Sequence, residues 1–171
     1  MSIAVRRLSN LSVRDLNKRC ALIIIADGFE EIETVTVLTL MRQAGLCIKS
    51  VGLTSGPVSG AHGVWVVPDL TLADVERLTD VTSISAVILP DGKQSLARLE
   101  ADPRVHRLLR QVVAQRGQIA TGRNGLKVVR AATVWDKVSA EVDNAFRVPV
   151  LVREWKQSAE KFVQELTRRL K

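Results

Sequence analysis

The most informative place for chemistry in this sequence is a turn at residues 117–125, with the letters GQIATGRNG. An apolar stretch runs into a glycine-containing turn, and many α/β enzymes hold a nucleophile on such a strand-to-turn elbow. The middle of this turn is Arg123, where no Ser, Cys or Thr stands. A guanidinium remains protonated at any accessible pH and is no nucleophile. The turn is therefore an elbow that lost its nucleophile, or one that never had it.

Two further turns carry carboxylates. The letters ADGFEEIE at residues 26–33 end on Glu33, and LPDG at residues 89–92 contains Asp91 followed by Gly92. Glu33 could act as a general acid or base, and together with Asp91 it could hold a cation. Two carboxylates beside an arginine make a poor metal site, however, so we expect neither a metal nor a cofactor.

The cysteines and histidines offer little further chemistry. Cys20 and Cys47 are too few to build a disulfide scaffold. Cys47 lies in a strand-like stretch and is expected in the core, whereas a reactive role for Cys20 has no support. His62 and His106 lie far apart, away from a cysteine at metal-ligand spacing, so a zinc site is not expected. Both histidines are expected at the surface.

Alternating apolar stretches must position these turns. Strands are expected at ALIIIA, CIKSVGL, GVWVVPD, ISAVIL, QIATG, VRAATVW and VPVLV, and helices at EEIETVTVLTLMRQAG, LTLADVERL, DPRVHRLLRQVVAQRG and 158–170. Asp102 suits a helix N-cap and Gly45 a C-terminal cap. We expect Ile32, Val35, Leu38, Met41 and Ala44 to form the inward face of the first helix. This β-α-β order predicts an α/β fold with a mostly parallel sheet between helices, whose three turns meet beyond the carboxyl ends of the strands.

The three turns together resemble the ThiJ/PfpI superfamily, which includes the parkinsonism-associated deglycase. The first block, from ALIIIADGFEEIE to RQAG, matches the family's strand, Gly-x-Glu-Glu-x-Glu turn and helix. PDLTLADV, AVILPDG and RGQIATGRNG follow the family's later segments. The resemblance covers residues 20–171 with gaps and is weak in the last third. It implies a flavodoxin-like fold, similar to class I glutamine amidotransferases, with a shortened C-terminal part.

The resemblance also implies a lost active site. The family uses a cysteine on the elbow, a glutamate from the first turn, an oxyanion site of backbone amides in a Gly-Gly turn, and in many members a histidine. Glu33 falls on the glutamate position, but Arg123 replaces the cysteine. With both residues at the former pocket, we predict an ion pair between them, because pairing offsets the desolvation of a buried acid. Asp91 and Gly92 replace the Gly-Gly turn, so a carboxylate would repel an oxyanion. Trp135 falls near the histidine position, and one catalytic element of four remains.

The chain is basic, with a net charge of +7 and a pI near 10.0, which favours anionic partners. Residues 1–19 form a basic extension with five basic residues and one acid, typical of a mitochondrial presequence or of an ordinary basic tail. The domain then spans 20–171, and its longest apolar run is too short to cross a membrane. Arginines that could contact RNA phosphates or a protein, or simply face solvent, are Arg104, Arg107, Arg110, Arg116, Arg168 and Arg169.

Three functions are compatible with these features. The first is a non-catalytic subunit of a larger assembly, mitochondrial if the extension is a targeting signal and otherwise cytoplasmic, such as a respiratory complex or the ribosome. The second is an active glyoxalase, deglycase or amidase-type hydrolase of the resembled family. The third is a stress- or redox-responsive module that binds a small ligand. The family's homodimer interface, which uses the first helix, could also form here.

Overall fold

The computed structural model describes residues 19–78, 84–132, 150–153 and 159–170. Six strands form one parallel sheet in the order β5-β2-β1-β6-β7-β8, and β3 and β4 form a separate antiparallel pair. The strands of the large sheet are β1 (Cys20–Ile25), β2 (Ile48–Gly52), β5 (Leu70–Thr71), β6 (Ile84–Leu89), β7 (Gln118–Gly122) and β8 (Val150–Arg153). The predicted α/β fold with a mostly parallel sheet is confirmed.

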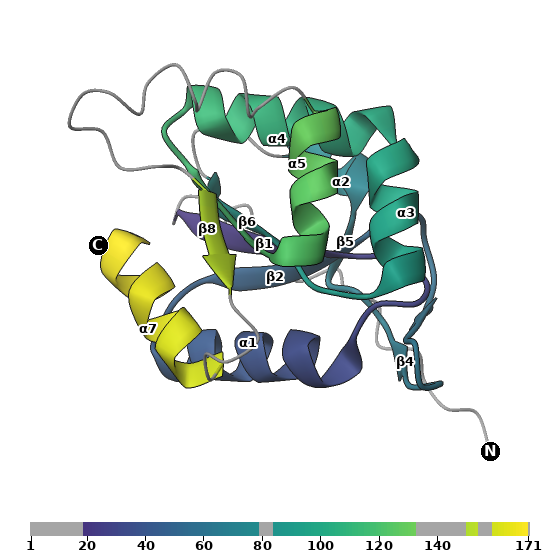
Figure 1. The fold of residues 1–171 in the computed structure, drawn as a ribbon, viewed down its shortest axis with the longest axis horizontal. Helices are drawn as coiled ribbons and strands as arrows, with labels where there is room; N and C mark the ends of the chain where they lie inside the picture. Colours follow the sequence, from purple (N-terminus) through teal and green to yellow (C-terminus); the bar gives the residue numbers. More distant parts are fainter. Residues whose placement is uncertain (1–18, 79–83, 133–149, 154–158, 171) are drawn as a thin grey trace.

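Helices cover both faces of the sheet, as Figure 1 shows. On one face lie α1 (Glu31–Gln43) and α7 (Ala159–Leu170), and on the other α2 (Leu72–Leu78), α3 (Lys93–Ala101), α4 (Pro103–Ala114) and α5 (Leu126–Ala131). In β1, Ile23 packs toward α1 and α7, whereas Leu22 and Ile24 belong to the core under the other helices. Successive side chains of a strand point to opposite faces, and helices cover both faces of this sheet. The strand is therefore fully buried.

Local sequence signals mark two of the helix ends. Asp102 accepts a hydrogen bond from the Arg104 amide at 2.9 Å and caps α4, with Pro103 in its first turn. Gly45 follows α1 with φ of 74° and donates to the Arg42 carbonyl. Both caps were predicted. The helix α3 was not, because its polar sequence KQSLARLEA shows only two strongly apolar positions, Leu96 and Leu99, which the structure buries.

Three expectations about elements were wrong. The buried face of α1 carries Thr34, Val37, Leu38 and Met41. Of the predicted face, Ile32 is 76% exposed, Val35 is 47% exposed and Ala44 is exposed as well. The start of VRAATVW lies in α5 and at its end, not in a strand. GVWVVPD contributes only β4 (Trp65–Val66), which pairs with β3 (Val58–Ser59) outside the main sheet. The short sequence GVWVVPD alternates in hydropathy, but Trp65 is 67% exposed.

No helix in the described part of the chain is both long and apolar enough to cross a bilayer. The basic extension falls almost wholly on residues 1–18, and Trp135 falls within 133–149. Both therefore lie outside the described residues.

Candidate functional site

The three turns singled out from the sequence meet at one end of the sheet. One follows β1, one follows β6 and one follows β7. From the neighbouring strands β1 and β6 the chain continues to opposite sides, to β2 and to β7. In open α/β sheets, ligands bind in the crevice beyond the carboxyl ends of the strands where the order reverses in this way. The candidate site is therefore this crevice.

Backbone and carboxylate groups join the first two turns directly. The Glu30 amide donates to the Asp91 carbonyl at 2.9 Å, and the Asp91 amide donates to Glu33 Oε2 at 2.8 Å. Gly92 has φ of 125°, and a Cβ there would collide with the Gly28 carbonyl oxygen and the Phe29 backbone. Only glycine accepts both this conformation and this approach. The PDG turn is therefore fixed against the first turn, and Glu33 serves to hold it.

The Asp91 carboxylate occupies the space between the PDG turn and the elbow. Asp91 is 8% exposed, and its Oδ2 lies 2.9 Å from the place a Cβ of Gly122 would take. Its Oδ1 is buried and, among the described residues, meets no hydrogen-bond partner. A buried carboxylate beside the elbow would repel an oxyanion formed there. The position that favours anions in the resembled family is therefore acidic in this chain.

Arg123 opens a short 3-10 turn, Arg123–Gly125, and is exposed. Among the described residues, Arg116 is the single non-glycine residue with positive φ, at 59°, so the backbone at Arg123 carries no left-handed strain. Nucleophile elbows depend on a sharp, strained turn. The elbow of this chain thus differs from a catalytic one in its backbone as well as its side chain. The ion pair between Glu33 and Arg123 stays a prediction.

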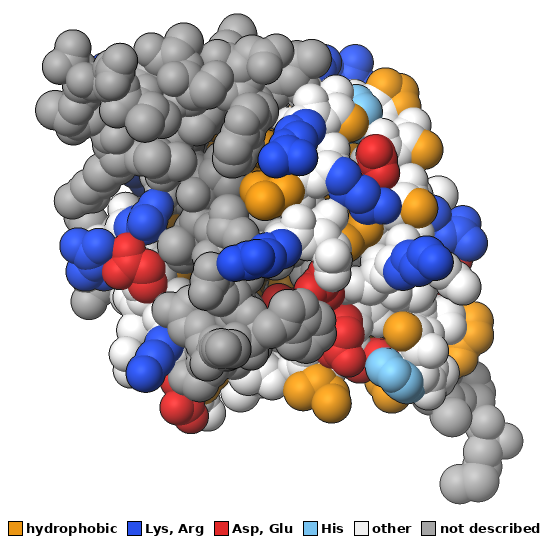
Figure 2. Space-filling model, in the orientation of Figure 1, with side chains coloured by type: hydrophobic (Ala, Val, Ile, Leu, Met, Phe, Trp, Pro, Cys, Tyr) orange, Lys and Arg blue, Asp and Glu red, His pale blue; other side chains and the backbone are white. Residues whose placement is uncertain are grey.

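A group that the sequence did not reveal lies beside the crevice, where the β3–β4 hairpin meets the first turn of α1. Glu31 is buried, and its carboxylate accepts from the His62 amide at 2.5 Å and contacts His62 Nδ1 at 2.8 Å. Glu30 Oε1 lies 4.0 Å from the same ring nitrogen. Figure 2 shows acidic side chains beside a histidine at this corner. The two residues are 31 positions apart, and no local pattern joins them.

The charges of this group are coupled. Burial acts to raise the pKa of Glu31, but hydrogen bonds from the His62 side chain and backbone outweigh it and lower the pKa to about 2. The hydrogen bond to Glu31, and then its charge, raise the pKa of His62. The ligand atoms of Glu30, Glu31 and His62 lie within 4.8 Å of one another, so these residues could hold a cation. The raised pKa of His62 works against this, because a proton competes for Nδ1.

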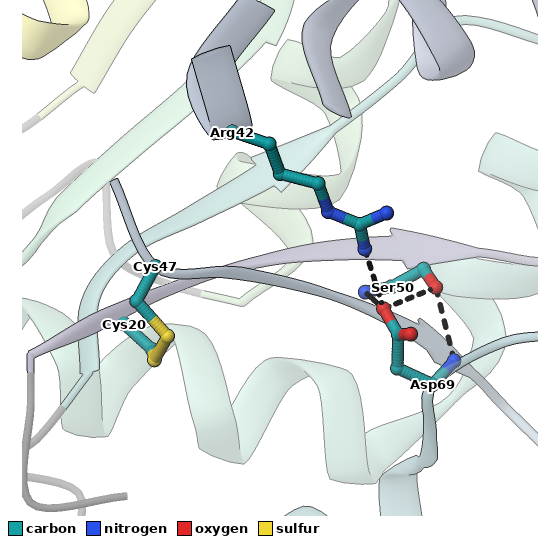
Figure 3. Close-up of a disulfide and its surroundings, with 5 residues drawn as sticks. All are labelled: Cys20, Arg42, Cys47, Ser50 and Asp69. Atoms are coloured by element: carbon teal, nitrogen blue, oxygen red, sulfur yellow. Dashed lines mark hydrogen bonds and ion pairs between the residues drawn. A yellow bond between two sulfur atoms is a disulfide. The ribbon is translucent and has the colours of Figure 1, made fainter. Parts of the chain in front are cut away.

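The cysteines are at the opposite end of the sheet and are joined. Cys20 begins β1, Cys47 precedes β2, and the two form a disulfide with a Cα–Cα distance of 4.6 Å (Figure 3). Cys47 was expected in the core, but it is half-buried and paired with Cys20. The parallel register, with Ala21 opposite Ile48, brings both residues side by side. His106 is also not a plain surface residue, because its Nε2 is buried.

The predicted basic contact residues are largely engaged within the chain. Arg104 pairs with Asp102 at 2.7 Å and Arg107 with Glu76 at 2.6 Å. Arg168 and Arg169 share Glu165, and Arg110 donates to the Ala132 carbonyl. Pairs of this kind reduce the positive charge offered to phosphates. An RNA-binding role stays a prediction.

Comparison with known proteins identifies the fold and the family. Residues 19–148 match the model of the DJ-1/PfpI family. The structure is similar to that of a mutant DJ-1 superfamily protein from Salmonella typhimurium, with a TM-score of 0.74 and 22% identity over 89% of this chain and 90% of the other. DJ-1beta from Drosophila melanogaster has a TM-score of 0.73 at 22% identity, with 90% of each chain covered.

Sequence relatives agree with this result. The chain is 34% identical over 101 residues to the Parkinson disease protein 7 homolog of Danio rerio, covering 58% of this chain and 52% of the relative. It is 30% identical over 103 residues to a glutathione-independent glyoxalase of Caenorhabditis elegans, covering 60% and 53%. It thus spans about half the length of the curated relatives it matches. The match to the family model covers most of the chain, and the chain belongs to the DJ-1/PfpI family.

Proposed function

We propose that this chain uses the DJ-1/PfpI fold without thiol catalysis and acts as a binding or structural protein. One observation carries the proposal. The chain has two cysteines, and both are tied in a disulfide at the amino end of the sheet, away from the crevice. At the elbow stands Arg123, which cannot attack a carbonyl carbon. The crevice therefore lacks the cysteine nucleophile that the chemistry of the family requires.

The groups around the elbow support the same proposal. Glu33 is engaged by the Asp91 amide, and the Asp91 carboxylate lies against Gly122. An oxyanion site needs donors aimed at the developing negative charge, whereas here a carboxylate fills that position. Glu33 thus has a structural role that accounts for its presence without catalysis.

Binding through protein contacts is supported by an exposed apolar surface. Five large apolar side chains of the described residues are exposed to solvent: Ile32, Val35, Val64, Trp65 and Val67. The bond between Glu31 and His62 places the β4 hairpin beside the first turn of α1, so these side chains flank one corner of the molecule. Exposed apolar groups gathered in this way mark interaction sites. We propose that this corner, here called the apolar corner, contacts another protein subunit of a larger assembly.

A glyoxalase or deglycase activity is the second candidate. Relatives named as a glutathione-independent glyoxalase in Caenorhabditis elegans and a deglycase in Thermococcus kodakarensis favour it. The latter is 32% identical over 72 residues, covering 42% of this chain and 41% of the relative. This candidate needs a nucleophile that is not a thiol at the elbow, because Arg123 holds that position.

Two measurements test the proposal. Purified chain should not consume methylglyoxal above the buffer rate, with or without a reductant that opens the disulfide. Turnover that Glu33→Gln abolishes would establish the second candidate instead. For the partner, the tagged chain is purified under native conditions from its own cells and its particle mass is measured. A particle much heavier than the 18.8 kDa chain, lost in Trp65→Ser, supports the assembly role, whereas a lone monomer or plain homodimer contradicts it.

The mitochondrial location is a separate proposal that rests on the basic composition of residues 1–19. A fluorescent fusion of the full chain, compared with one in which Arg6, Arg7 and Arg14 are replaced by Glu, tests it. Mitochondrial signal that the charge reversal abolishes supports a targeting role. A diffuse signal in both would leave these residues as an ordinary basic tail.

A further inference from the structure

The disulfide between Cys20 and Cys47 lies outside the candidate site. We propose that it is a reversible thiol–disulfide exchange site, opened at Cys47 by low-molecular-weight thiols such as glutathione. Three features of the structure lead to this assignment: the strand register that aligns the two cysteines, their unequal exposure, and a polar cluster that holds the same region together without the disulfide.

The register aligns the two cysteines whether or not they are bonded. Ala21 donates its amide to the Cys47 carbonyl at 2.8 Å, and the ladder continues through Ala21 and Ile48. The Cα–Cα distance of 4.6 Å is within the range of natural disulfides. Since backbone hydrogen bonds set this distance, the two thiols should stay adjacent after reduction. The pair can therefore close again without a search for its partner.

The exposure of the two residues differs. Cys20 is 4% exposed, whereas Cys47 is half-buried at the end of the loop that follows α1. An incoming thiolate can reach the Cys47 sulfur more easily than that of Cys20. Its attack forms a mixed disulfide on Cys47, and the Cys20 sulfur leaves with the electron pair and takes a proton from water. A second thiol then attacks the mixed disulfide, which releases Cys47 as a thiol and yields one oxidised thiol dimer.

The bond closes a loop with a sequence separation of 27, which contains α1 and the turn that carries Glu33. A second tie holds the same region without sulfur. Asp69 Oδ2 accepts from Arg42 at 3.0 Å, from the Ser50 amide at 2.8 Å and from the Ser50 hydroxyl at 2.9 Å (Figure 3). This cluster links the end of α1 to β2 and to the chain before β5. Reduction should therefore loosen the β1-α1-β2 unit while leaving the domain folded.

The test compares single-cysteine variants under native conditions. Purified Cys20→Ser, which keeps Cys47, and Cys47→Ser, which keeps Cys20, are mixed with oxidised glutathione and followed by intact mass. We expect Cys20→Ser to take up one glutathione at least 10-fold faster than Cys47→Ser. Equal rates, or a faster Cys47→Ser, would overturn the assignment. Circular dichroism of both variants confirms that they are folded, and the wild-type reaction below does not depend on either.

A second test uses the wild-type chain, whose thiols are counted by alkylation and whose melting temperature is measured before and after reduction. Air-purified protein should resist alkylation until a thiol reductant is added, and then accept two alkyl groups. Its melting temperature should fall by about 10 °C on reduction while a cooperative transition remains. Free thiols in the air-purified chain, an unchanged melting temperature, or a disulfide that glutathione cannot open in the folded chain would each refute the proposal. The methylglyoxal assay is independent of this outcome.

Discussion

The two ends of the parallel sheet have different chemistry. At the carboxyl ends of β1, β6 and β7, three turns meet. Hydrogen bonds join the first two, and Arg123 opens the short turn after β7. At the amino ends of β1 and β2, a disulfide joins the two strands. The Asp69 cluster links the end of α1 to β2 and to the chain before β5. The resembled family needs a thiol at the carboxyl end, whereas all the cysteine of this chain is at the amino end. The two proposals made above give the crevice an architectural role and assign thiol–disulfide exchange to the opposite end of the sheet.

The largest effect is expected from Gly92→Ala at the carboxyl end. The new Cβ would collide with the Gly28 carbonyl and the Phe29 backbone, and the φ of 125° strains an alanine further. We expect a loss of about 4 kcal/mol in the free energy of unfolding, measured by urea denaturation. Gly56→Ala is the matched control, since it has φ of 102° and open space around its Cβ. A loss in Gly92→Ala no greater than in the control would show that the two turns are not packed as described.

The next effect is expected at the amino end, from Asp69→Ala. This change removes one carboxylate oxygen that accepts three hydrogen bonds, one of them from the buried Ser50 amide. We expect a loss of about 2 kcal/mol, again from urea denaturation, and a larger fractional loss when the disulfide is reduced. Glu76→Ala removes an exposed ion pair with Arg107 and should change stability by less than about 0.5 kcal/mol. Similar losses of stability in both variants would show that Asp69 does not hold α1, β2 and the chain before β5 together.

A gain in stability is expected from Asp91→Asn. The buried Oδ1 of Asp91 makes no hydrogen bond within the described residues, and a neutral amide of the same shape is cheaper to bury than a carboxylate. Denaturation should show an increase of about 1 kcal/mol at neutral pH. Asp27→Asn is a suitable control because Asp27 is exposed. A clear loss of stability in Asp91→Asn would mean that the carboxylate is bound by a group essential to the fold.

The smallest effect concerns pH and the bond between Glu31 and His62. The pKa of His62 is raised above 6.5, so its contribution is complete below pH 6.5 and is lost as the pH rises through the raised pKa. The lowered pKa of Glu31, about 2, makes its contribution complete above about pH 4.5 and lost as the pH falls toward 2. The melting temperature of the wild type should therefore fall above pH 6.5 relative to His62→Gln. Parallel curves for the two proteins would show that this bond does not secure the β4 hairpin.

The sequence predicted the meeting of the three turns because its signals were local and consistent. Buried β-branched runs mark β1 and β6, and the cap at Asp102 marks a helix between β6 and β7. In a parallel sheet, this order alone brings the carboxyl ends together. The position of Arg123 at the start of a short turn after β7 followed from the same order.

The errors arose where packing, rather than local pattern, decides. The helix α1 is apolar on more than one side, so periodicity allowed Ile32 and Val35 to face the core, whereas the structure buries Thr34, Val37 and Met41. The disulfide depends on the pairing of β1 with β2 and on which residues end up opposite each other, and composition does not reveal this. The contact of His62 with Glu31 depends on a hairpin whose strands have two residues each.

The central claim is that the crevice has no glyoxalase or deglycase activity, and methylglyoxal turnover tests it most directly. The wild-type chain, oxidised and reduced, is compared with the double variant Arg123→Cys and Asp91→Gly, which restores a thiol at the elbow beside Glu33 and removes the competing carboxylate. The account predicts buffer-level turnover for both wild-type forms, whatever the double variant gains. Turnover by the wild type above the buffer rate, abolished by Glu33→Gln, would contradict it.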